Sequence, residues 1–161
     1  MSNEQQETLP RRLRRLREIW TERGRGLFFV TVCTSSRRKI LANTDLHLVF
    51  REYCQRSPQV LSTHVGRYII MPDHIHVFVS CAGSHALSRW TKGLKGTLAK
   101  HLRAKGISGP FWQDGFFDHL LRSSESYGDK WNYVFRNPER AGLVQNAEGW
   151  EFAGEIECIV W

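Results

Sequence analysis

The chain has 161 residues, of which 41% are hydrophobic, enough for one domain with a buried core and too few for two. No segment is apolar enough to cross a membrane, and the polar first ten residues lack the apolar run of a signal peptide, so we expect a cytoplasmic protein without a membrane partner. The 23 Lys and Arg residues exceed the 16 Asp and Glu residues, and the net charge of +7 slightly favours a polyanionic partner such as nucleic acid.

Residues 1–26 are predicted to be a basic arm. Five arginines fall within seven positions, and Leu13, Leu16 and Trp20 recur at helical spacing. Two interpretations stay open, an amphipathic arm that grips DNA phosphates and a disordered tail. The candidate DNA-binding residues of the arm are Arg11, Arg12, Arg14 and Arg15.

Residues 27–144 are predicted to form one domain, followed by a tail over residues 145–161 whose last stretch has no assigned structure. Strands are expected where β-branched and aromatic residues gather, over residues 27–33, 65–71, 74–80 and roughly 111–121. Helices are expected from an N-cap at Asp45 to before Pro58, over residues 85–105, and from about 124 to Asn137. This β-α-β-β-α-β order with a terminal helix predicts an α+β fold, a ferredoxin-like or RRM-like antiparallel sheet with two helices on one face.

Two histidines stand two positions apart in the third predicted strand. Because side chains alternate along a strand, His74 and His76 point to one face and Ile75 to the other, which the helices must cover. We therefore expect the histidines on the open side of the sheet, close enough together to share a metal ion. Alone, this pattern is weak, because surface or hydrogen-bonded histidines also produce it.

A tyrosine and an asparagine follow on the last predicted helix. Tyr133 and Asn137 are four positions apart, which puts them on one side of a helix. Each has an ordinary structural explanation, since Tyr133 can pack in a core and the Asn137-Pro138 pair can end a helix. In combination with the histidine pair, they predict a phosphoryl-transfer centre.

Each member of this centre has a chemical task. A divalent ion bound by His74, His76 and Asn137 polarises a scissile phosphate as a Lewis acid. In this hypothesis Tyr133 is the expected nucleophile, and its attack would leave a covalent phosphotyrosine that stores the bond energy. Rejoining then needs no ATP, which agrees with the absence of a GxxxxGK[ST] loop from the sequence.

Three ordered motifs carry a resemblance to a known family. They are Met71–Val77 (MPDHIHV), Phe111–His119 (FWQDGFFDH), and Tyr133–Pro138 (YVFRNP) followed by Arg140–Val144 (RAGLV). From about residue 27 to residue 144 the sequence resembles the single-tyrosine HUH transposases, and among them the REP-associated tyrosine transposases. The resemblance implies cleavage and rejoining of single-stranded DNA that folds into palindromic hairpins.

The resemblance also implies a role for each centre residue. His74 and His76 match the metal-binding pair, Tyr133 matches the nucleophile, and Asn137 matches the third ligand. The family forms a 5′-phosphotyrosine link, leaves a free 3′-hydroxyl and uses Mg²⁺ or Mn²⁺, which agrees with a ligand set of two imidazoles and an amide oxygen. Mobile relatives are dimers that can exchange the tyrosine helix, so a monomer and a homodimer both stay open.

Basic residues elsewhere in the chain are candidates for holding DNA. The second predicted helix carries a basic stripe, for which a solvated surface is the ordinary explanation. Arg122 and Arg136 flank the catalytic elements and are the better candidates. The named DNA-binding candidates outside the arm are Lys92, Lys95, Arg122 and Arg136.

Aromatic residues near the fourth predicted strand have two interpretations. Trp112, Phe116 and Phe117 are either core residues or platforms on which bases stack. Phe116 and Phe117 are adjacent and cannot both face the same way, so we expect one of them in the core.

Two other functions compete with a tyrosine transposase. The first is a catalytically inactive, RRM-like module that binds nucleic acid or regulates, derived from a transposase. The second is a metal-dependent phosphodiesterase that uses water as its nucleophile and forms no protein–DNA adduct. The presence of all four centre residues favours the active enzyme.

Overall fold

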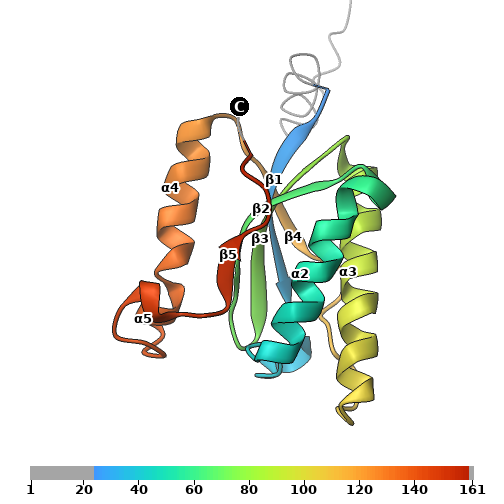
Figure 1. Ribbon diagram of the computed structural model, residues 1–161, viewed down its shortest axis with the longest axis vertical. Helices are drawn as coiled ribbons and strands as arrows, with labels where there is room; N and C mark the ends of the chain where they lie inside the picture. The colour runs from blue at the N-terminus through green and yellow to red at the C-terminus, as the bar shows by residue number, and fades with distance from the viewer. Residues whose placement is uncertain (1–23, 160–161) are drawn as a thin grey trace, which may run out of the picture.

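One five-stranded antiparallel sheet organises the computed structural model, which describes residues 24–159 (Figure 1). The arm candidates Arg11, Arg12, Arg14 and Arg15 lie outside the described residues. The strands are β1 (Gly26–Cys33), β2 (His64–Ile70), β3 (His74–Cys81), β4 (Phe117–Leu120) and β5 (Ala153–Glu155). Their order across the sheet is β4-β1-β3-β2-β5, so the first four strands confirm the predicted ferredoxin-like arrangement.

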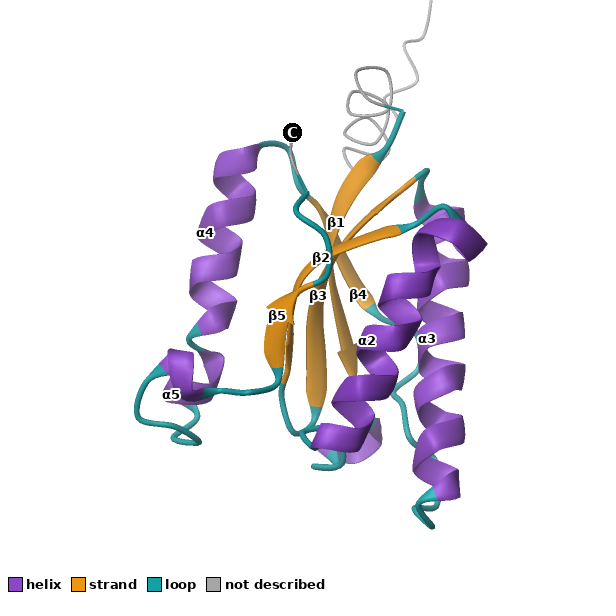
Figure 2. Cartoon of the chain, in the orientation of Figure 1, coloured by secondary structure: helices purple, strands orange, loops and turns teal. Residues whose placement is uncertain are grey.

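Helices cover both faces of this sheet (Figure 2). Helices α2 (Thr44–Leu61) and α3 (Ser84–Ala104) lie on one face, and α4 (Ser124–Phe135) lies on the other. Three short helices, η1 (Ser35–Arg37), α5 (Asn137–Arg140) and η2 (Ala147–Gly149), occupy connections. The helix that carries the tyrosine therefore stands across the sheet from the other two long helices.

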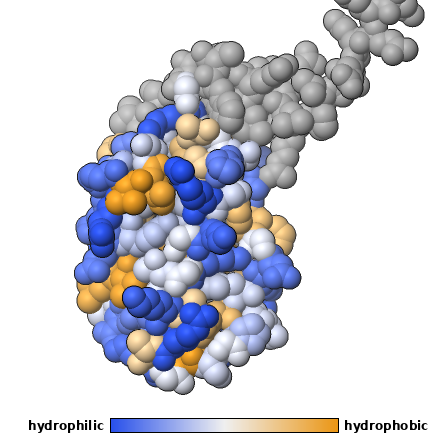
Figure 3. Space-filling model, turned by 90° about the vertical axis from the view of Figure 1, so that its right-hand side faces the viewer, coloured by the Kyte–Doolittle hydropathy of each residue, from blue (hydrophilic) through white to orange (hydrophobic). Residues whose placement is uncertain are grey.

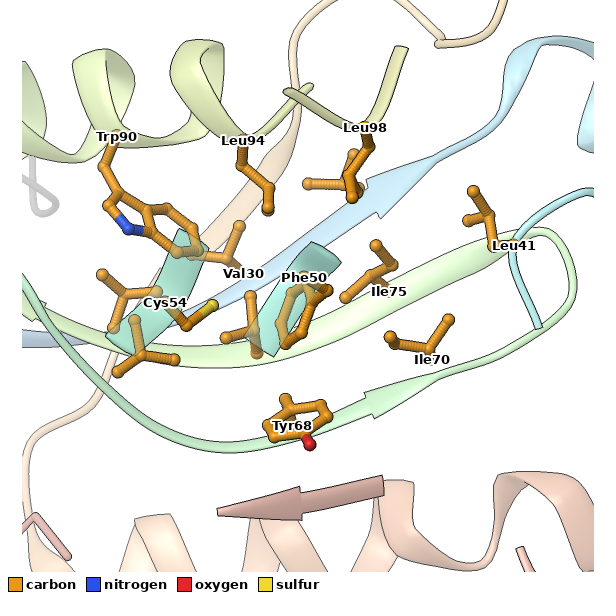
Figure 4. Packing of buried hydrophobic residues seen from close by; sticks show 14 of the residues in the cluster. Val30, Leu41, Phe50, Cys54, Tyr68, Ile70, Ile75, Trp90, Leu94 and Leu98 are labelled. Carbon is orange, nitrogen blue, oxygen red and sulfur yellow. The ribbon is translucent and has the colours of Figure 1, made fainter. Parts of the chain in front are cut away.

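The main core lies between the sheet and the α2–α3 layer (Figure 4). Apolar residues of α3 recur every three or four positions, and Trp90, Leu94 and Leu98 are all fully buried. They meet Val30 of β1 and Ile75 of β3, which point to the same side of their strands. This packing fixes which face of each strand is turned towards α2 and α3, and thereby which face carries the histidines.

Helix α2 differs from its prediction at both ends. Its N-cap is Asn43 and not Asp45, because the Asn43 side chain accepts a hydrogen bond from the Leu46 N–H at 2.9 Å. The helix also continues through Pro58 to Leu61, although proline disfavours helical geometry in the residue before it. Ser57, the residue concerned, is held in place by tertiary contact, since its hydroxyl accepts a 2.9 Å bond from the Trp90 indole of α3.

The chain also departs from prediction on either side of α4. Strand β4 spans only four of the eleven expected residues, because Gly115 adopts a left-handed φ of 69° that interrupts an extended run. Helix α4 ends at Phe135, and Asn137 begins α5. Asn137 therefore does not share a helix with Tyr133, contrary to what the spacing predicts. Strand β5 comes from the unassigned tail and pairs with β2.

The surface over α2 and α3 is mostly hydrophilic, with separate hydrophobic patches (Figure 3). Exposed apolar side chains on α2 include Leu48 and Val60. Of the helices within residues 24–159, none has both the length and the apolarity needed to span a bilayer.

Candidate active site

The two histidines of β3 lie side by side on the sheet face turned away from α2 and α3. Ile75, between them, is buried under those helices, as strand alternation requires. The ring centroids of His74 and His76 are 4.7 Å apart. The histidines thus share one face as predicted, but that face is less open than expected, since only 14% of the His74 side chain is exposed.

Each imidazole is oriented by a hydrogen bond at its Nδ1 atom. Nδ1 of His74 lies 2.7 Å from Oδ1 of Asp73, and Nδ1 of His76 lies 2.8 Å from Oγ1 of Thr31. Arg37 holds the carboxylate in turn, with its Nε 2.9 Å from Oδ2 of Asp73. Because an ionised carboxylate can only accept a hydrogen bond, His74 donates from a protonated Nδ1 and keeps the lone pair of Nε2 for a ligand.

Both imidazoles are neutral at neutral pH because the site is shielded from water. Burial lowers the pKa of His74, against the opposing effect of Asp73. Burial and the surrounding positive charges lower the pKa of His76 to about 3. Although burial raises the pKa of Asp73, the hydrogen bond with His74 and the charge of Arg37 bring it below its ordinary value. Neutral imidazoles beside a carboxylate are the form in which histidine binds metal ions.

Helix α4 covers part of this face, over β2 and β3. It begins after Ser123, whose hydroxyl accepts a hydrogen bond from the backbone N–H three residues later at 3.2 Å. Tyr127 packs against Phe78 of β3, with ring centroids 4.6 Å apart, and Val134 is buried. These contacts turn the other side of α4, which carries Tyr133, towards solvent.

Lys130 links α4 to the histidine pair. Its Nζ lies 5.3 Å from the centre of the Phe29 ring, in a cation–π contact. Phe29 is in turn stacked on His76, with centroids 5.1 Å apart and planes 23° apart. Helix α4 therefore brings a positive charge near the histidines, of the sign that favours a phosphate.

Tyr133 is exposed and is contacted by an arginine that sequence reasoning missed. The guanidinium of Arg140 lies 4.3 Å from the centre of the Tyr133 ring, and the tyrosine residue is 65% exposed. Arg140 also donates a hydrogen bond to Oδ1 of Asn137. One side chain thus connects the predicted nucleophile with the predicted third ligand across the junction of α4 and α5.

Two surface depressions border Tyr133. One, of about 790 Å³, lies where α4, α5 and η2 meet and includes Arg136. The other, of about 350 Å³, lies between α4 and the end of β4 and includes Lys130. Neither His74 nor His76 is among the described residues that line these two depressions. The structure therefore brings the histidines together and brings Tyr133 together with Asn137, with α4 joining the two groups.

The candidate metal ligands are not an all-acidic or cysteine-rich cluster. Within residues 24–159, no three His, Cys, Asp or Glu side chains are arranged to hold a metal ion. The predicted set has a different composition, since it combines two histidines with the amide oxygen of Asn137. Two neutral imidazoles and an amide oxygen fit a divalent ion that keeps further positions for phosphate and water.

The basic candidates outside the arm have different surroundings. Lys95 holds the loop before β4, because its Nζ donates a hydrogen bond to the Gln113 carbonyl at 2.8 Å. Burial also lowers the pKa of Lys95. Lys92 is exposed on α3, the helix across the sheet from the histidines. Arg122 and Arg136 are exposed at the two ends of α4 and bracket the tyrosine.

The residues that sequence reasoning missed differ in the signal they leave. Asp73 directly precedes His74 within the MPDHIHV motif, so its role as an orienting carboxylate was open to prediction. Arg140 begins the RAGLV motif and follows Asn137 by three positions. Thr31 leaves no such signal, because it lies 45 residues from His76 and only the register of β1 on β3 pairs them.

Comparisons with known proteins agree with this fold and motif order. The profile of the family described as "Transposase IS200 like" matches residues 27–131, which includes both histidines and ends two residues before Tyr133. A REP-associated tyrosine transposase of Escherichia coli K12 is 23% identical over 129 residues, covering 80% of this chain and 75% of the relative. A similar protein of Haemophilus influenzae is 23% identical over 139 residues, covering 80% of this chain and 78% of the relative.

A solved structure shows the same fold. It is that of a REP-associated tyrosine transposase bound to a REP hairpin, with a TM-score of 0.65 and 22% identity, covering 80% of this chain and 75% of that one. Because the family profile spans about two thirds of the sequence and contains the histidine strand, the chain belongs to the IS200-like transposases, a family of single-tyrosine enzymes that act on DNA.

Proposed function

We propose that this transposase cuts and rejoins single-stranded DNA beside palindromic hairpins, through a 5′-phosphotyrosine formed on Tyr133 and with a divalent metal ion as cofactor. The observation that carries the proposal is the histidine pair, with neutral rings 4.7 Å apart and each Nδ1 engaged in a hydrogen bond. Such an arrangement prepares two Nε2 atoms for one ion, on a family fold in which α4, the helix on the same side of the sheet, carries an exposed tyrosine.

The residues proposed to hold Mg²⁺ or Mn²⁺ are His74, His76 and Asn137. When bound, the ion supplies Lewis acidity to the nonbridging oxygens of the scissile phosphate. Oδ1 of Asn137 accepts a hydrogen bond from Arg140, and an amide oxygen has a second lone pair for a ligand. Asp73 and Thr31 hold the two imidazole rings in the orientation that this role requires.

The chemical step is an exchange of one phosphoester for another. The Tyr133 oxygen, having lost its proton, attacks phosphorus, and the bond between phosphorus and the 3′-oxygen breaks. The departing 3′-oxygen takes a proton to become a hydroxyl, and the 5′-phosphate stays on the tyrosine. Attack of a 3′-hydroxyl on this phosphotyrosine reverses the exchange and restores a phosphodiester without ATP. Lys130 and Arg140 supply positive charge on either side of the nucleophile.

The proposed division of the chain assigns catalysis to residues 27–144 and DNA gripping to the basic arm of residues 1–26, with residues 145–161 as a C-terminal tail. Hairpin DNA as partner is supported by the similar solved structure, in which a REP-associated tyrosine transposase is bound to a REP hairpin. Arg122 and Arg136 are proposed phosphate contacts beside the tyrosine, and Lys92 and Lys95 more distant ones. A cytoplasmic site of action and a monomeric or homodimeric state are part of the same proposal.

The test uses labelled hairpin oligonucleotides built from palindromes that flank the coding sequence in its genome. Wild-type protein is expected to release a shorter strand and to form a covalent adduct on a denaturing gel, with Mg²⁺ or Mn²⁺ and not with EDTA. Tyr133→Phe removes the nucleophilic oxygen and should abolish both products. Tyr127→Phe is the matched control, because it removes the hydroxyl of a second tyrosine of α4 that points into the core.

Two outcomes contradict the proposal and identify its competitors. A cleaved strand without any adduct, undiminished in Tyr133→Phe, indicates a phosphodiesterase that uses water. Hairpin binding that persists unchanged in EDTA, with no product for any flanking palindrome, indicates a binding or regulatory module.

A further inference from the structure

An exposed aromatic ring lies in the same row of the sheet as the candidate metal ligands. In the strand register, Phe117 of β4 pairs with Thr31 of β1, and Thr31 pairs with His76 of β3. Residues paired across antiparallel strands point to the same face, so all three side chains face the histidine side. Two strand spacings separate Phe117 from His76, which amounts to about 10 Å.

Phe117 does not contribute to the core. The residue is 67% exposed, whereas the adjacent Phe116 is partly buried and packs against the main core. Adjacent residues at the start of β4 face opposite ways, so Phe116 is the one of the pair that packs against the core, as expected. A large apolar ring held in solvent by a short regular strand has no structural role among the described contacts.

The surroundings of Phe117 favour a planar, charged partner over a protein partner. Its direct neighbours on this face are polar, namely Thr31 across the strand pair and His119 two positions along β4, and the ring opposite His119, that of Phe29, is partly buried. A protein interface needs a contiguous apolar patch, which a single ring flanked by polar groups does not provide. A nucleobase needs only one aromatic face and a positive charge for its phosphate.

A depression on the same face lies between this strand and the proposed nucleophile. His119 borders the depression of about 350 Å³ between β4 and α4, and Lys130 and Tyr133 form part of its wall. Lys130 also lies over Phe29, whose ring is stacked on His76. The ring, the depression and the tyrosine therefore follow one another on a single side of the molecule, as a bound single strand requires.

We propose that Phe117 is a stacking platform for one unpaired nucleobase of the DNA substrate, a binding subsite at the β4 edge of the sheet. The inference rests on the proposed function for its ligand, hairpin DNA, and for placing this base next to the cleaved phosphate. Stacking on a protein aromatic ring strengthens single-strand binding by on the order of 10-fold per base.

The experiment measures binding in the full-length Tyr133→Phe protein with Mg²⁺, so that chemistry does not interfere. The ligands are the flanking hairpin oligonucleotides, and each unpaired nucleotide beside the stem is replaced in turn by an abasic one. Phe117→Ala is expected to weaken binding about 10-fold, and Phe117→Trp to restore it. Leu48→Ala is the matched control, since Leu48 is an exposed apolar residue on α2, across the sheet.

The decisive result is the coupling between protein and base. One abasic position should weaken binding to the Tyr133→Phe protein and have no further effect when Phe117 is also alanine. The subsite does not exist if every abasic position lowers the binding affinity equally in both proteins. It does not exist either if Phe117→Ala binds all the oligonucleotides with unchanged affinity. The wild-type adduct assay fails or succeeds separately, so failure of the catalytic proposal is distinguishable from failure of this one.

Discussion

At the scale of single residues, the histidine pair depends on neighbours that are not ligands. Asp73 accepts a hydrogen bond from His74 at 2.7 Å and forms a salt bridge with Arg37 at 2.9 Å. These two contacts in series fix the ring of His74. The second ring depends on a neutral hydroxyl, that of Thr31, and on the stacked Phe29. The rings are thus held by different means, and only one of them is held by a charge.

We predict that Asp73→Asn lowers metal affinity without abolishing the chemistry. An amide fixes the His74 tautomer less firmly than a carboxylate and makes the ring less basic, and removal of such a partner costs about 10- to 100-fold in metal affinity. Adduct formation, measured against Mn²⁺ concentration, should need correspondingly more metal and recover at high Mn²⁺. Asp45→Asn, at an exposed carboxylate of α2, is the control, and equal Mn²⁺ dependence in both variants would argue against the assignment.

A second prediction at this scale concerns pH and stability. Burial lowers the pKa of His47, which lies 2.8 Å from the Tyr68 hydroxyl, so the folded chain keeps it neutral. As pH falls through about 6.5, the unfolded chain binds a proton at His47 that the folded chain does not, and stability is lost.

Urea unfolding at pH 7.5 and at pH 5.5 measures this effect. Wild type should lose more stability on acidification than His47→Gln, because the variant lacks the group that titrates only when unfolded. An identical loss in both proteins would show that His47 is protonated equally in the two states.

At the scale of elements, the crossing of α2 and α3 depends on a glycine. A methyl group at Gly93 would collide with the Tyr53 hydroxyl, which is held in place by donating to the Trp90 carbonyl at 2.7 Å. At Gly96, on the same helix, a methyl group would meet nothing within 4 Å.

We predict opposite effects of the same substitution at these two positions. Gly96→Ala should stabilise the protein by about 1 kcal/mol through helix propensity. Gly93→Ala gains the same propensity but overpacks the crossing at a cost of about 1–3 kcal/mol, so it should be neutral to destabilising. Denaturant titration of the free energy of unfolding compares them. Adding Tyr53→Phe should relieve the clash, and a strictly additive double variant would be evidence against it.

Elements with a regular apolar pattern were open to prediction, and those decided by distant contacts were not. The strands that contain His74 and Val30 follow from alternation, and α3 follows from its leucine spacing. Strand β5 has only Ala153, Gly154 and Glu155, residues with little strand preference, and it exists because β2 pairs with it. The helix break has a local signal in Pro138, but that signal predicts a helix that ends at Asn137, whereas α4 ends at Phe135 and Asn137 begins α5.

The candidate site divides in the same way. His74 and His76 share a face because side chains alternate along a strand, which the sequence alone shows. The exposure of Tyr133 follows from its place opposite the apolar side of α4. The contacts of Thr31 with His76 and of Arg140 with Tyr133 require the register of strands and the turn between helices, which no local pattern specifies.

At the scale of the whole molecule, the excess of positive charge predicts salt-dependent DNA binding. Replacing Arg11, Arg12, Arg14 and Arg15 by glutamine together should weaken hairpin binding for all sequences alike. Each phosphate that the arm no longer neutralises should reduce the slope of log affinity against log salt by about 0.7–0.9. Titrations at several salt concentrations give the slope, and an unchanged slope would mean that the arm does not touch phosphates.

The connectivity of the sheet has a consequence for any exchange of parts between two copies. Helix α4 follows β4 at one edge of the sheet and precedes β5 at the other, so the chain that carries Tyr133 is anchored at both margins. To exchange this helix with a partner in a domain-swapped dimer, a copy would have to separate β5 from β2 or extend residues 141–152 from one copy to the other. A helix α4 that packs on the sheet of its own chain avoids both costs. We therefore expect Tyr133 to act in cis, with the histidines of the same chain.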